Sequence, residues 1–434
     1  MVGMNSLREN QTNESYFSIR GGFELAGEIP VRGSKNTILP IIAATLLTRE
    51  PCIIENVPRI TDANVMLQIA ESLGAEVEWD EKNHRVTIQA RNIKDDFPDT
   101  DLSRRLRGSV LFAGALLART GRARMSYPGG DIIGARPLIT HFNALKGLGV
   151  TISEGDVISL DGTHMRGARI FLEEPSVTAT ENVILASIRA PGKTEIRLPA
   201  CEPHVQELVA FLARMGAKIR WRDLYWIEVE GVEKLHGATH RINPDDIEIS
   251  SFAALAAATR SSITLTQADS PYLDAIFLQL SKMGVSFRSS GGRIEIHKPK
   301  SSYTGFRIQS GLYPKLMSDH IPPFAVLATQ AEGASLIHDW MYENRLRYIA
   351  ELQKMGADAS LLDPHRAIIR GPTKLVGCKT VSSDIRSGMT LVVAALVAEG
   401  ESMIEGVHHL DRGYEKIEER LQSIGARIRR VKNE

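Results

Sequence analysis

The sequence has few features of a secreted, membrane-spanning or nucleic-acid-binding protein. Its 434 residues include only three cysteines, Cys52, Cys201 and Cys378, and no CxxC pair. This scatter argues against a disulfide framework and a structural zinc site, and it suits a reducing compartment. No apolar run is long enough to cross a bilayer, because the candidates at 38–47 and 389–398 are short and end in charged residues. Residues 1–15 are polar and have no apolar signal-peptide core.

The chain also has no net charge, since Lys plus Arg number 52 and Asp plus Glu number 52. Without net positive charge it has no overall attraction for nucleic acid or anionic membranes. Apolar residues make up 43% and charged residues 24%, which is typical of a globular chain and excludes a mainly disordered one. We therefore expect a cytoplasmic globular protein of two or three domains, with no nucleic-acid or membrane partner.

What the sequence does have is an internal repeat. A five-residue pattern recurs six times: an apolar residue, Gly, a small residue, a variable residue and a residue that is usually apolar. The glycines are Gly74, Gly149, Gly216, Gly284, Gly356 and Gly425. Such a regular period across the whole chain indicates one supersecondary unit used six times, and it constrains the fold more than local propensity does.

Each copy predicts the same elements. An amphipathic helix such as 62–73 precedes the Gly, which takes the C′ position with positive φ. Alternating residues around Val77 and Val86 then predict two strands joined by a turn at 82–83. A more apolar and therefore buried helix lies earlier in each copy, at 39–47, 110–117, 183–188, 252–258, 323–329 and 391–398. A strand joins the two helices, and one more strand precedes each unit. We expect an α/β fold of six helix–strand–helix–strand–strand units.

Polar and ionic residues gather where these helices start. Near the buried helices they are Lys35-Asn36, Arg107, Glu181-Asn182, Asp245-Asp246, Ser318-Asp319 and Asp384-Ile385-Arg386; near the second helices they are Arg136, Glu202, Asn344-Arg345 and Arg412. We interpret Asp62 and Ser251 as N-caps. Arginines at helix starts oppose the helix dipole and need a negative partner. The pattern therefore predicts a multiply anionic ligand. The histidines His204, His320 and His408-His409 match no metal-site spacing, and we interpret them as structural or peripheral to the substrate.

At these residues the chain resembles the enolpyruvyl transferase superfamily and, within it, the UDP-N-acetylglucosamine 1-carboxyvinyltransferase family. The matching segments run in order from about Gly22 to Val431. They are Gly33–Asn36, Pro128–Gly130, Ile133–Pro137, Ser176-Val177, Ala179–Asn182, Glu202-Pro203, Ser318-Asp319, Glu343–Arg345, Ser383–Arg386 and Asp411–Glu415. The sister family that makes enolpyruvylshikimate phosphate fits less well, because its Ser-Asn-Arg stretch and Gly-Asn-Ala-Gly-Thr loop are not in the sequence.

The resemblance implies two inside-out α/β barrel domains of three repeats each, joined by a double crossover. The first would span 36–243 and carry the Pro-Gly-Gly loop; the second would span 244–434 and be completed by the N-terminal strand 14–35. The implied reaction transfers enolpyruvyl from phosphoenolpyruvate to the 3′-hydroxyl of UDP-N-acetylglucosamine by addition and elimination, and it releases phosphate. This is the first committed step of peptidoglycan precursor synthesis. The resemblance implies no cofactor and no metal, and we expect a monomer.

The resemblance also assigns roles to residues. Lys35, Arg136 and Arg412 would hold the phosphate of phosphoenolpyruvate, and Arg345 and Arg386 its carboxylate. Asp319 would act as base on the sugar hydroxyl, and Asp384 and Ile385 would lie near the reacting centre. The residues implied for the sugar nucleotide are Asn36, Arg107, Arg136, Pro137, Ser176 and Val177. The catalytic set is then Lys35, Asp131, Asp319 and Arg412.

Three positions depart from the family pattern. Asp131 replaces the loop cysteine that fosfomycin alkylates, and a carboxylate is a much weaker nucleophile than a thiolate, so we expect an active, fosfomycin-resistant enzyme. Ile139 replaces an aspartate in the part that grips uracil, and Thr178 replaces a glycine near the diphosphate. These two changes keep an alternative open, a paralogue that acts on another nucleotide sugar or nucleoside. A catalytically silent scaffold is the other alternative, and the intact set of clamp residues disfavours it.

Overall fold

The computed structural model describes residues 15–131 and 133–432, which form a mixed α/β structure. Six helices are almost wholly buried: α1 (Lys35–Thr45), α4 (Leu111–Thr120), α6 (Val177–Ser187), α8 (Asp246–Ala258), α10 (Pro322–Thr329) and α12 (Ile385–Val397). Six more precede the repeated glycines: α2 (Thr61–Ser72), α5 (Ile139–Gly147), α7 (Pro203–Arg214), α9 (Asp274–Lys282), α11 (Tyr348–Lys354) and α14 (Ile417–Gln422). Short helical segments are α3 (Thr100–Ser103), η1 (Arg107–Val110), η2 (Ser318–His320), η3 (Arg345–Arg347) and α13 (His408–Asp411).

The strands form one sheet for each repeat. In spatial order, the sheets of the first and second repeats are β13 (Thr239–Arg241), β3 (Cys52–Glu55), β5 (Arg85–Gln89), β4 (Glu76–Asp80), and β6 (Arg122–Met125), β8 (Ile158–Asp161), β7 (Thr151–Ser153). Those of the third and fourth repeats are β11 (Lys218–Asp223), β12 (Trp226–Glu230), β10 (Lys193–Arg197), β9 (Arg169–Phe171), and β15 (Phe287–Ser290), β16 (Arg293–Ile296), β14 (Ser262–Thr266), β2 (Ala26–Pro30). Those of the fifth and sixth repeats are β17 (Arg307–Gln309), β18 (Gly333–His338), β20 (Arg366–Gly371), β19 (Asp358–Asp363), and β21 (Lys379–Val381), β22 (Glu401–Glu405), β1 (Ser15–Arg20), β23 (Arg427–Lys432).

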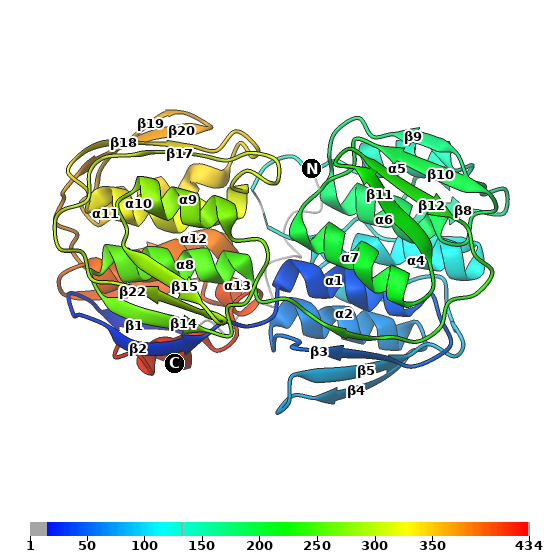
Figure 1. Cartoon of the computed structure of the whole chain (residues 1–434), viewed down its shortest axis with the longest axis horizontal. Coiled ribbons are helices and arrows are strands. Elements are labelled where there is room, and N and C mark those ends of the chain that lie inside the picture. The colour runs from blue at the N-terminus through cyan, green and yellow to red at the C-terminus, as the bar shows by residue number, and fades with distance from the viewer. Residues whose placement is uncertain (1–14, 132, 433–434) are drawn as a thin grey trace, which may run out of the picture.

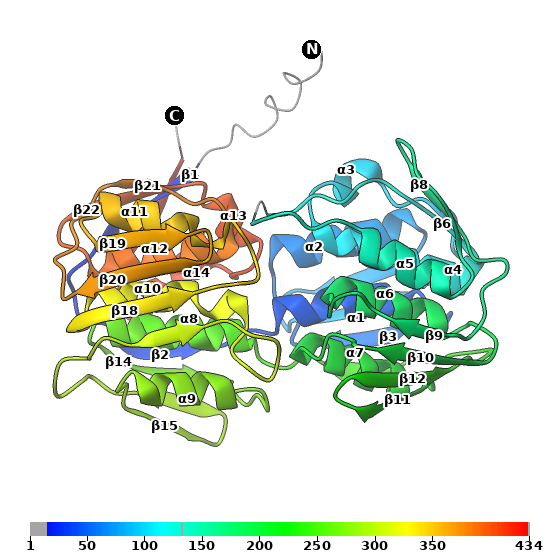
Figure 2. The same ribbon diagram turned by 90° about the horizontal axis from the view of Figure 1, so that it is seen from above.

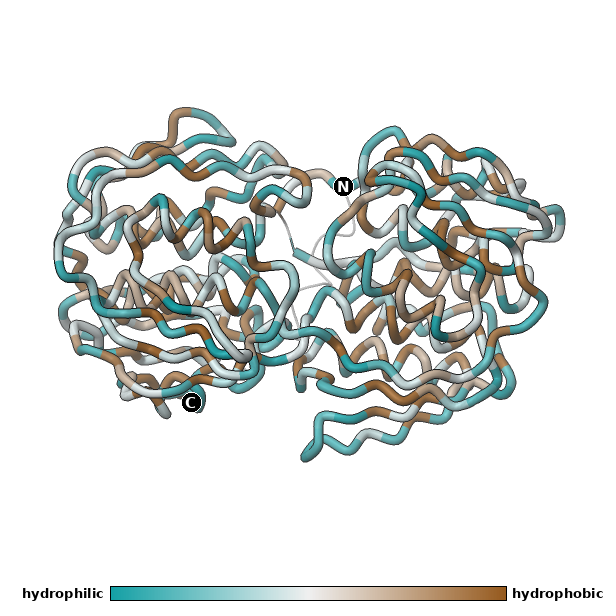
Figure 3. Tube along the Cα trace, in the orientation of Figure 1, coloured by the Kyte–Doolittle hydropathy of each residue, from teal (hydrophilic) through white to brown (hydrophobic). Residues whose placement is uncertain are grey.

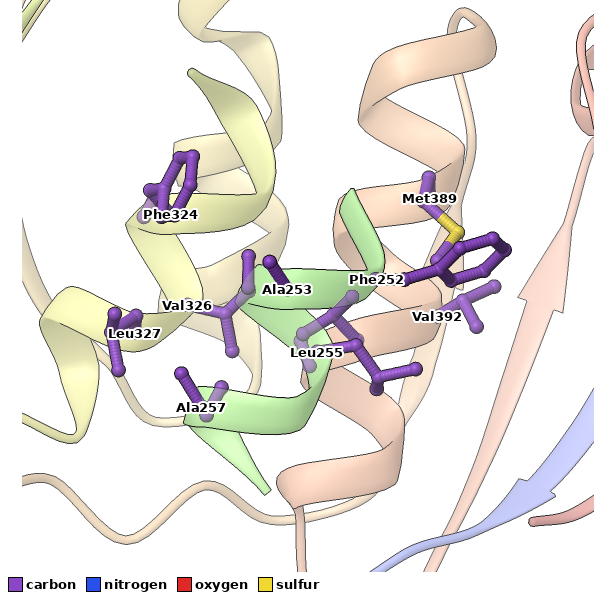
Figure 4. Packing of buried hydrophobic residues seen from close by; sticks show 14 of the residues in the cluster. Phe252, Ala253, Leu255, Ala257, Phe324, Val326, Leu327, Met389 and Val392 are labelled. Carbon is purple, nitrogen blue, oxygen red and sulfur yellow. The ribbon is translucent and has the colours of Figure 1, made fainter. Parts of the chain in front are cut away.

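Buried apolar side chains form two separate clusters. The cluster here called core A draws its members from residues 38–242, and core B draws its members from 17–31 and 249–428. In core B the inner helices α8, α10 and α12 pack on one another, with Phe252 close to Met389 and Val392 (Figure 4). Sheets lie outside these helices (Figures 1 and 2). Brown, apolar stretches of the chain run through the inner helices, and the surface loops are mainly teal (Figure 3).

The predicted repeat is confirmed in its local geometry. All six repeated glycines have positive φ, between 79° and 102°, as a C′ glycine requires. The two strands expected around Val77 and Val86 pair as β4 and β5. Some inner helices begin earlier than their apolar pattern predicted. For example, α8 starts at Asp246 rather than at 252, because its first turn is polar and is capped by the Asp245 carboxylate.

Two repeats differ from the common plan. In the part of the chain that the structure describes, no strand lies between β5 and α4, so the extra strand expected for the second repeat is wrong. This stretch contains Asp95, Asp96 and Pro98, and such residues disfavour strands. In the sixth repeat, one of the two strands expected after α14 comes from elsewhere in the chain. The N-terminal strand β1 lies between β22 and β23 instead and pairs antiparallel with both.

The chain exchanges two strands between the two cores. Strand β2 comes just before α1, yet it pairs parallel with β14 in the fourth repeat. Strand β13 comes just before α8, yet it pairs parallel with β3 in the first repeat. Figure 1 shows β1 and β2, in blue, beside strands of the second half, while α1 lies with the first half. The exchange places the start of α1 next to the start of α8, where the Lys35 backbone N–H donates to Asp245 at 3.0 Å.

Candidate active site

A cavity of about 450 Å³ is lined by residues from both cores. Most of the residues that the resemblance implies for the site line it, namely Lys35, Asn36, Arg107, Asp131, Arg136, Pro137, Ser176, Val177, Asp319, Arg345, Ile385 and Arg386. Arg412 and Asp384 are not among the lining residues. Both nevertheless contact residues that are, as described below. The inner helices α1, α6 and α12 begin at this cavity, which is why residues far apart in the sequence meet there.

A carboxylate between two arginines lies on the core B side. Arg345 Nη2 lies 2.5 Å from Asp319 Oδ1, and Arg386 Nε donates to Asp319 Oδ2 at 3.1 Å. Burial would raise the pKa of Asp319, but the charges of Arg386, Arg345 and Lys35 more than offset this and hold it far below its ordinary value. Asp319 is therefore ionised, and it is a weak base while both arginines remain paired with it.

Asp384 does two things in this structure. Its carboxylate caps α12 by accepting the backbone N–H groups of Arg386 and Ser387, and it lies 3.5 Å from Arg345 Nη1. Asp384 thus fixes the start of α12 and the orientation of Arg345. Asp384 does not line the cavity itself, and it supports the site through Arg345, which does line it.

A second ion cluster joins the two cores. Asp62 lies 3.1 Å from Lys35 Nζ and accepts hydrogen bonds from Arg412 Nε at 2.9 Å and Arg412 Nη2 at 3.2 Å. The third nitrogen of the Arg412 guanidinium, Nη1, contacts the Asp131 carboxylate. Burial raises the pKa of Asp62, but the charges of Lys35 and Arg412 outweigh it and lower the pKa. Arg412 is therefore held by two carboxylates from the other core.

The interpretation of Asp62 and Ser251 as N-caps is wrong. The N-cap of α2 is Ile60, which makes no side-chain cap bond, and Asp62 is 3% exposed at the second helical position. Its carboxylate forms ion pairs with Lys35 and Arg412 instead. Ser251 lies inside α8, where its hydroxyl donates to the Ile247 carbonyl and contacts the Tyr414 hydroxyl. In both cases the residue is interpreted as a helix cap from its position in the sequence, but its side chain contacts a residue far away in the chain.

The Pro-Gly-Gly loop contacts core B elements. The Asp131 carbonyl accepts a hydrogen bond from Arg136 Nη2 at 2.6 Å, and the Asn344 N–H donates to the Ile133 carbonyl at 3.1 Å. Gly134 has φ 146°, and a Cβ there would lie 2.2 Å from Glu343 Oε2, so only glycine allows this approach. The loop is thus closed against the second half of the chain.

A smaller cavity of about 350 Å³ shares Arg107, Arg136 and Pro137 with the main one, and Ile139 lines it. Ile139 is 48% exposed. Burial and the charge of Arg136 lower the pKa of Arg107 to about 10, which leaves it charged at neutral pH. His141 Nε2 lies 2.8 Å from Thr178 Oγ1, so the two departures from the family pattern lie in adjoining segments.

Several lining residues were missed or underrated by sequence reasoning. Glu174, Trp340 and Tyr342 line the main cavity and were not singled out, because none belongs to a recognisable motif. His204 also lines it, so its interpretation as structural or peripheral understated its position. Burial lowers the pKa of His204 to about 4, and it is neutral at pH 7. Within residues 15–131 and 133–432, no group of three His, Cys, Asp or Glu residues is arranged to hold a metal ion.

Comparison with known proteins agrees with this geometry. The model of the EPSP synthase (3-phosphoshikimate 1-carboxyvinyltransferase) family matches residues 19–421. The UDP-N-acetylglucosamine 1-carboxyvinyltransferase of Treponema denticola is 43% identical over 420 residues, which cover 95% of this chain and 98% of that protein. The enzyme of the same name from Bradyrhizobium diazoefficiens is 42% identical over 426 residues, with 96% and 98% covered.

Among solved structures, the enolpyruvyl transferase NikO from Streptomyces tendae superposes with a TM-score of 0.89 at 24% identity, and the match covers 97% of this chain and 100% of NikO. The fold is therefore that of the enolpyruvyl transferases. The chain belongs to this family of carboxyvinyltransferases, and its relatives of 38–43% identity place it in the UDP-N-acetylglucosamine 1-carboxyvinyltransferase branch. The resemblance stated from the sequence is confirmed. No helix of the described chain has the length and apolar character to cross a membrane.

Proposed function

We propose that this chain transfers enolpyruvyl from phosphoenolpyruvate to the 3′-hydroxyl of UDP-N-acetylglucosamine and releases phosphate. The observation that carries the proposal is one cavity that holds Lys35, Arg136, Arg345 and Arg386 around the Asp319 carboxylate. Phosphoenolpyruvate carries a carboxylate and a phosphate, and each matches a guanidinium fork or an ammonium. Family membership supports the reaction, and the names of the relatives support the acceptor.

The ion pairs of Asp319 suggest how substrate binding prepares the base. Arg345 and Arg386 are now neutralised by Asp319. An incoming carboxylate would compete for these two guanidinium groups and leave Asp319 with fewer positive partners. Its pKa would then rise, since the charges that lower it would be shared. Asp319 could accept the proton of the acceptor hydroxyl only in this ternary complex, which ties base strength to occupancy of the site.

The same reasoning applies to the departing phosphate. Lys35, Arg136 and Arg412 would hold it, and in this structure Asp62 and Asp131 occupy Lys35 and Arg412. Lys35 can also give a proton to the methylene carbon, because its ammonium reaches the cavity. Asp131 is paired with Arg412 here, and phosphate binding at Arg412 would free it to take up a proton and then act as an acid, or to assist product release.

The finer architecture also belongs to this proposal. We assign core A to a domain of residues 36–243 and core B to a domain of 244–434 completed by an N-terminal strand within 14–35, each an inside-out α/β barrel with its helices inside. The two clusters and the exchange of β2 and β13 support this division. We further propose that the enzyme works as a monomer in the cytoplasm.

The test is phosphate release by the full chain with both substrates, followed by mass analysis of the product. The Arg386→Gln variant should lose at least a hundredfold in turnover. Arg370→Gln, an exposed arginine of β20 that pairs with Asp358, is the matched control and should not change turnover. Absence of phosphate release with phosphoenolpyruvate and every acceptor tried would favour the silent scaffold.

A second candidate is transfer to another nucleotide sugar or nucleoside. The observation that favours it is Ile139, exposed in the smaller cavity beside Arg136 and Pro137. An apolar side chain there cannot accept the hydrogen bond that a base N–H offers to an aspartate. A panel of uridine and other nucleotides in the same assay decides between the two acceptors by their kcat/KM values.

A further inference from the structure

One wall of the main cavity carries carboxyl groups that the reaction above does not use. Along α6, Val177, Thr178 and Glu181 line the cavity from one helix face, and Glu202 and His204 line it from the start of α7. Glu181 is 1% exposed and Glu202 is 6% exposed. Their atoms Glu181 Oε1 and Glu202 Oε2 have no hydrogen-bond partner among the described residues. A buried polar atom without a partner is costly, so a ligand that supplies one gains affinity.

The charges around Glu181 do not neutralise it. The elements packed against α6 are α4, α5, α7, β10, β12 and η1. Their titratable and charged groups, with the cap of α7, are Arg119, His141, Lys146, Glu202, His204, Glu207, Arg214, Lys193, Glu195, Arg197, Glu228, Glu230 and Arg107. Of these, the charge that acts on Glu181 is that of Glu202, and it has the same sign. Burial and this repulsion raise the pKa of Glu181 well above its ordinary value, and burial raises that of Glu202 as well.

We propose that the Glu181 carboxyl group determines acceptor specificity by donating a hydrogen bond to an uncharged oxygen of the acceptor, an amide carbonyl or a hydroxyl. The inference rests on the proposed function. A carboxylic acid has one O–H donor, whereas an ionised carboxylate has none. The cationic part of the cavity suits the anionic donor substrate, and this wall suits the uncharged part of the acceptor. The charge that acts on Glu181 is that of Glu202, which would repel a phosphate at this wall.

The experiment compares three variants of the full chain by phosphate release, with the concentration of UDP-N-acetylglucosamine varied at saturating phosphoenolpyruvate. Glu181→Gln keeps a hydrogen-bond donor and cannot ionise. Glu181→Leu removes the donor. Glu228→Gln is the control, because Glu228 is a glutamate of β12, which also packs on α6, but it pairs with Arg220 and Arg222 outside the cavity. Thermal unfolding of each variant reports on the fold.

The expected result is a split between KM and kcat. Glu181→Leu should raise the KM for the acceptor about tenfold, the cost of one lost hydrogen bond, and leave kcat and the KM for phosphoenolpyruvate within about threefold. Glu181→Gln and Glu228→Gln should keep the acceptor KM of the unmodified chain at neutral pH. As the pH rises through the raised pKa of Glu181, the acceptor KM of the unmodified chain should increase, and that of Glu181→Gln should stay flat.

An unchanged acceptor KM in Glu181→Leu would overturn the proposal. If that variant does not fold, coincident KM–pH profiles for the unmodified chain and Glu181→Gln would overturn it in the same way. A loss of kcat at constant KM would also overturn it, because it would make Glu181 part of the chemistry rather than of acceptor binding. Failure of the proposed function looks different, since the unmodified chain itself would then release no phosphate, and both proposals would fall.

Discussion

Asp319 and Glu181 are two buried carboxyl groups in one cavity, and their surroundings drive their pKa values in opposite directions. Asp319 contacts Arg345 and Arg386, and its pKa is held far down. Burial and the like charge of Glu202 raise the pKa of Glu181. Burial acts in the same direction on both, so the difference comes from the neighbouring charges, which are positive around Asp319 and negative beside Glu181. One cavity thereby holds a carboxyl group whose surroundings favour the ionised form and another whose surroundings favour the protonated form.

The largest effect should come from Asp319→Asn, which removes the ionised member of the pair. The amide cannot accept a proton from the acceptor hydroxyl, so we expect kcat to fall about a thousandfold, within the usual range for loss of a general base. Asp358→Asn, at an exposed aspartate of β19, is the control and should be neutral. A fall in kcat of less than tenfold would mean that another group is the base.

Arg412→Lys should have the next largest effect. The Arg412 guanidinium binds Asp62 with two nitrogens and Asp131 with the third. A lysine ammonium is a single point charge and cannot reproduce this arrangement or a bidentate grip on phosphate. We expect turnover to fall roughly ten- to a hundredfold while the midpoint of thermal unfolding changes little, and phosphate release beside a melting curve measures both. Near-normal turnover would remove Arg412 from the phosphate site.

Asp131→Cys should alter inhibition more than turnover. The unmodified chain offers a carboxylate paired with Arg412, which is a weak nucleophile towards the fosfomycin epoxide. A cysteine there would lie beside the same guanidinium, and a nearby cation favours the thiolate. Intact-mass spectrometry after incubation with fosfomycin should show an adduct on the variant alone. An adduct on the unmodified protein, or none on the variant, would contradict the expectation.

The same replacement tests whether Asp131 works as an acid. If it does, the pH optimum of the unmodified chain should lie on the acid side of the optimum of Asp131→Cys, because a carboxyl group loses its proton at lower pH than a thiol. Identical optima would indicate that residue 131 is a turn residue of the loop with no part in proton transfer.

The smallest effect concerns stability at acid pH. Burial lowers the pKa of His204 to about 4, against an ordinary value of 6.5. Between these values the unfolded chain binds a proton that the folded chain does not, so the free energy of unfolding must fall as the pH is lowered from about 6.5 to about 4. His204→Asn should flatten this decline in urea titrations. The raised pKa of Glu181 acts in the opposite sense, so Glu181→Gln should steepen it.

Local patterns in the sequence were enough to predict much of this molecule. Six glycine-marked repeats gave the number of units, and the polar residues at helix starts included most of the charged residues that line the cavity. Local patterns could not predict the strand exchange, because the sequences of β2 and β13 do not indicate which sheet each strand joins. The resemblance supplied the expectation of a crossover, and the register of β2 with β14 came only with the structure.

The two wrong N-cap assignments share one physical cause. A polar residue at a helix start can cap its own helix or reach a distant partner, and the sequence looks the same in both cases. Asp245 caps α8 as its position suggests, whereas Asp62 reaches Lys35 and Arg412. Glu181 shows the converse limit. The sequence shows a residue that is usually charged, and only its burial beside Glu202 in the structure shows that its pKa is raised.

The position of β1 has a consequence for synthesis of the chain. This strand leaves the ribosome long before its two neighbours β22 and β23, because Ser18 is 383 residues from its hydrogen-bond partner Glu401. At 5–20 residues per second, β1 waits roughly 20 to 80 s before it can pair. During that time two edges of an apolar strand are open to any other nascent chain. Chaperone dependence of this protein should therefore be concentrated in β1.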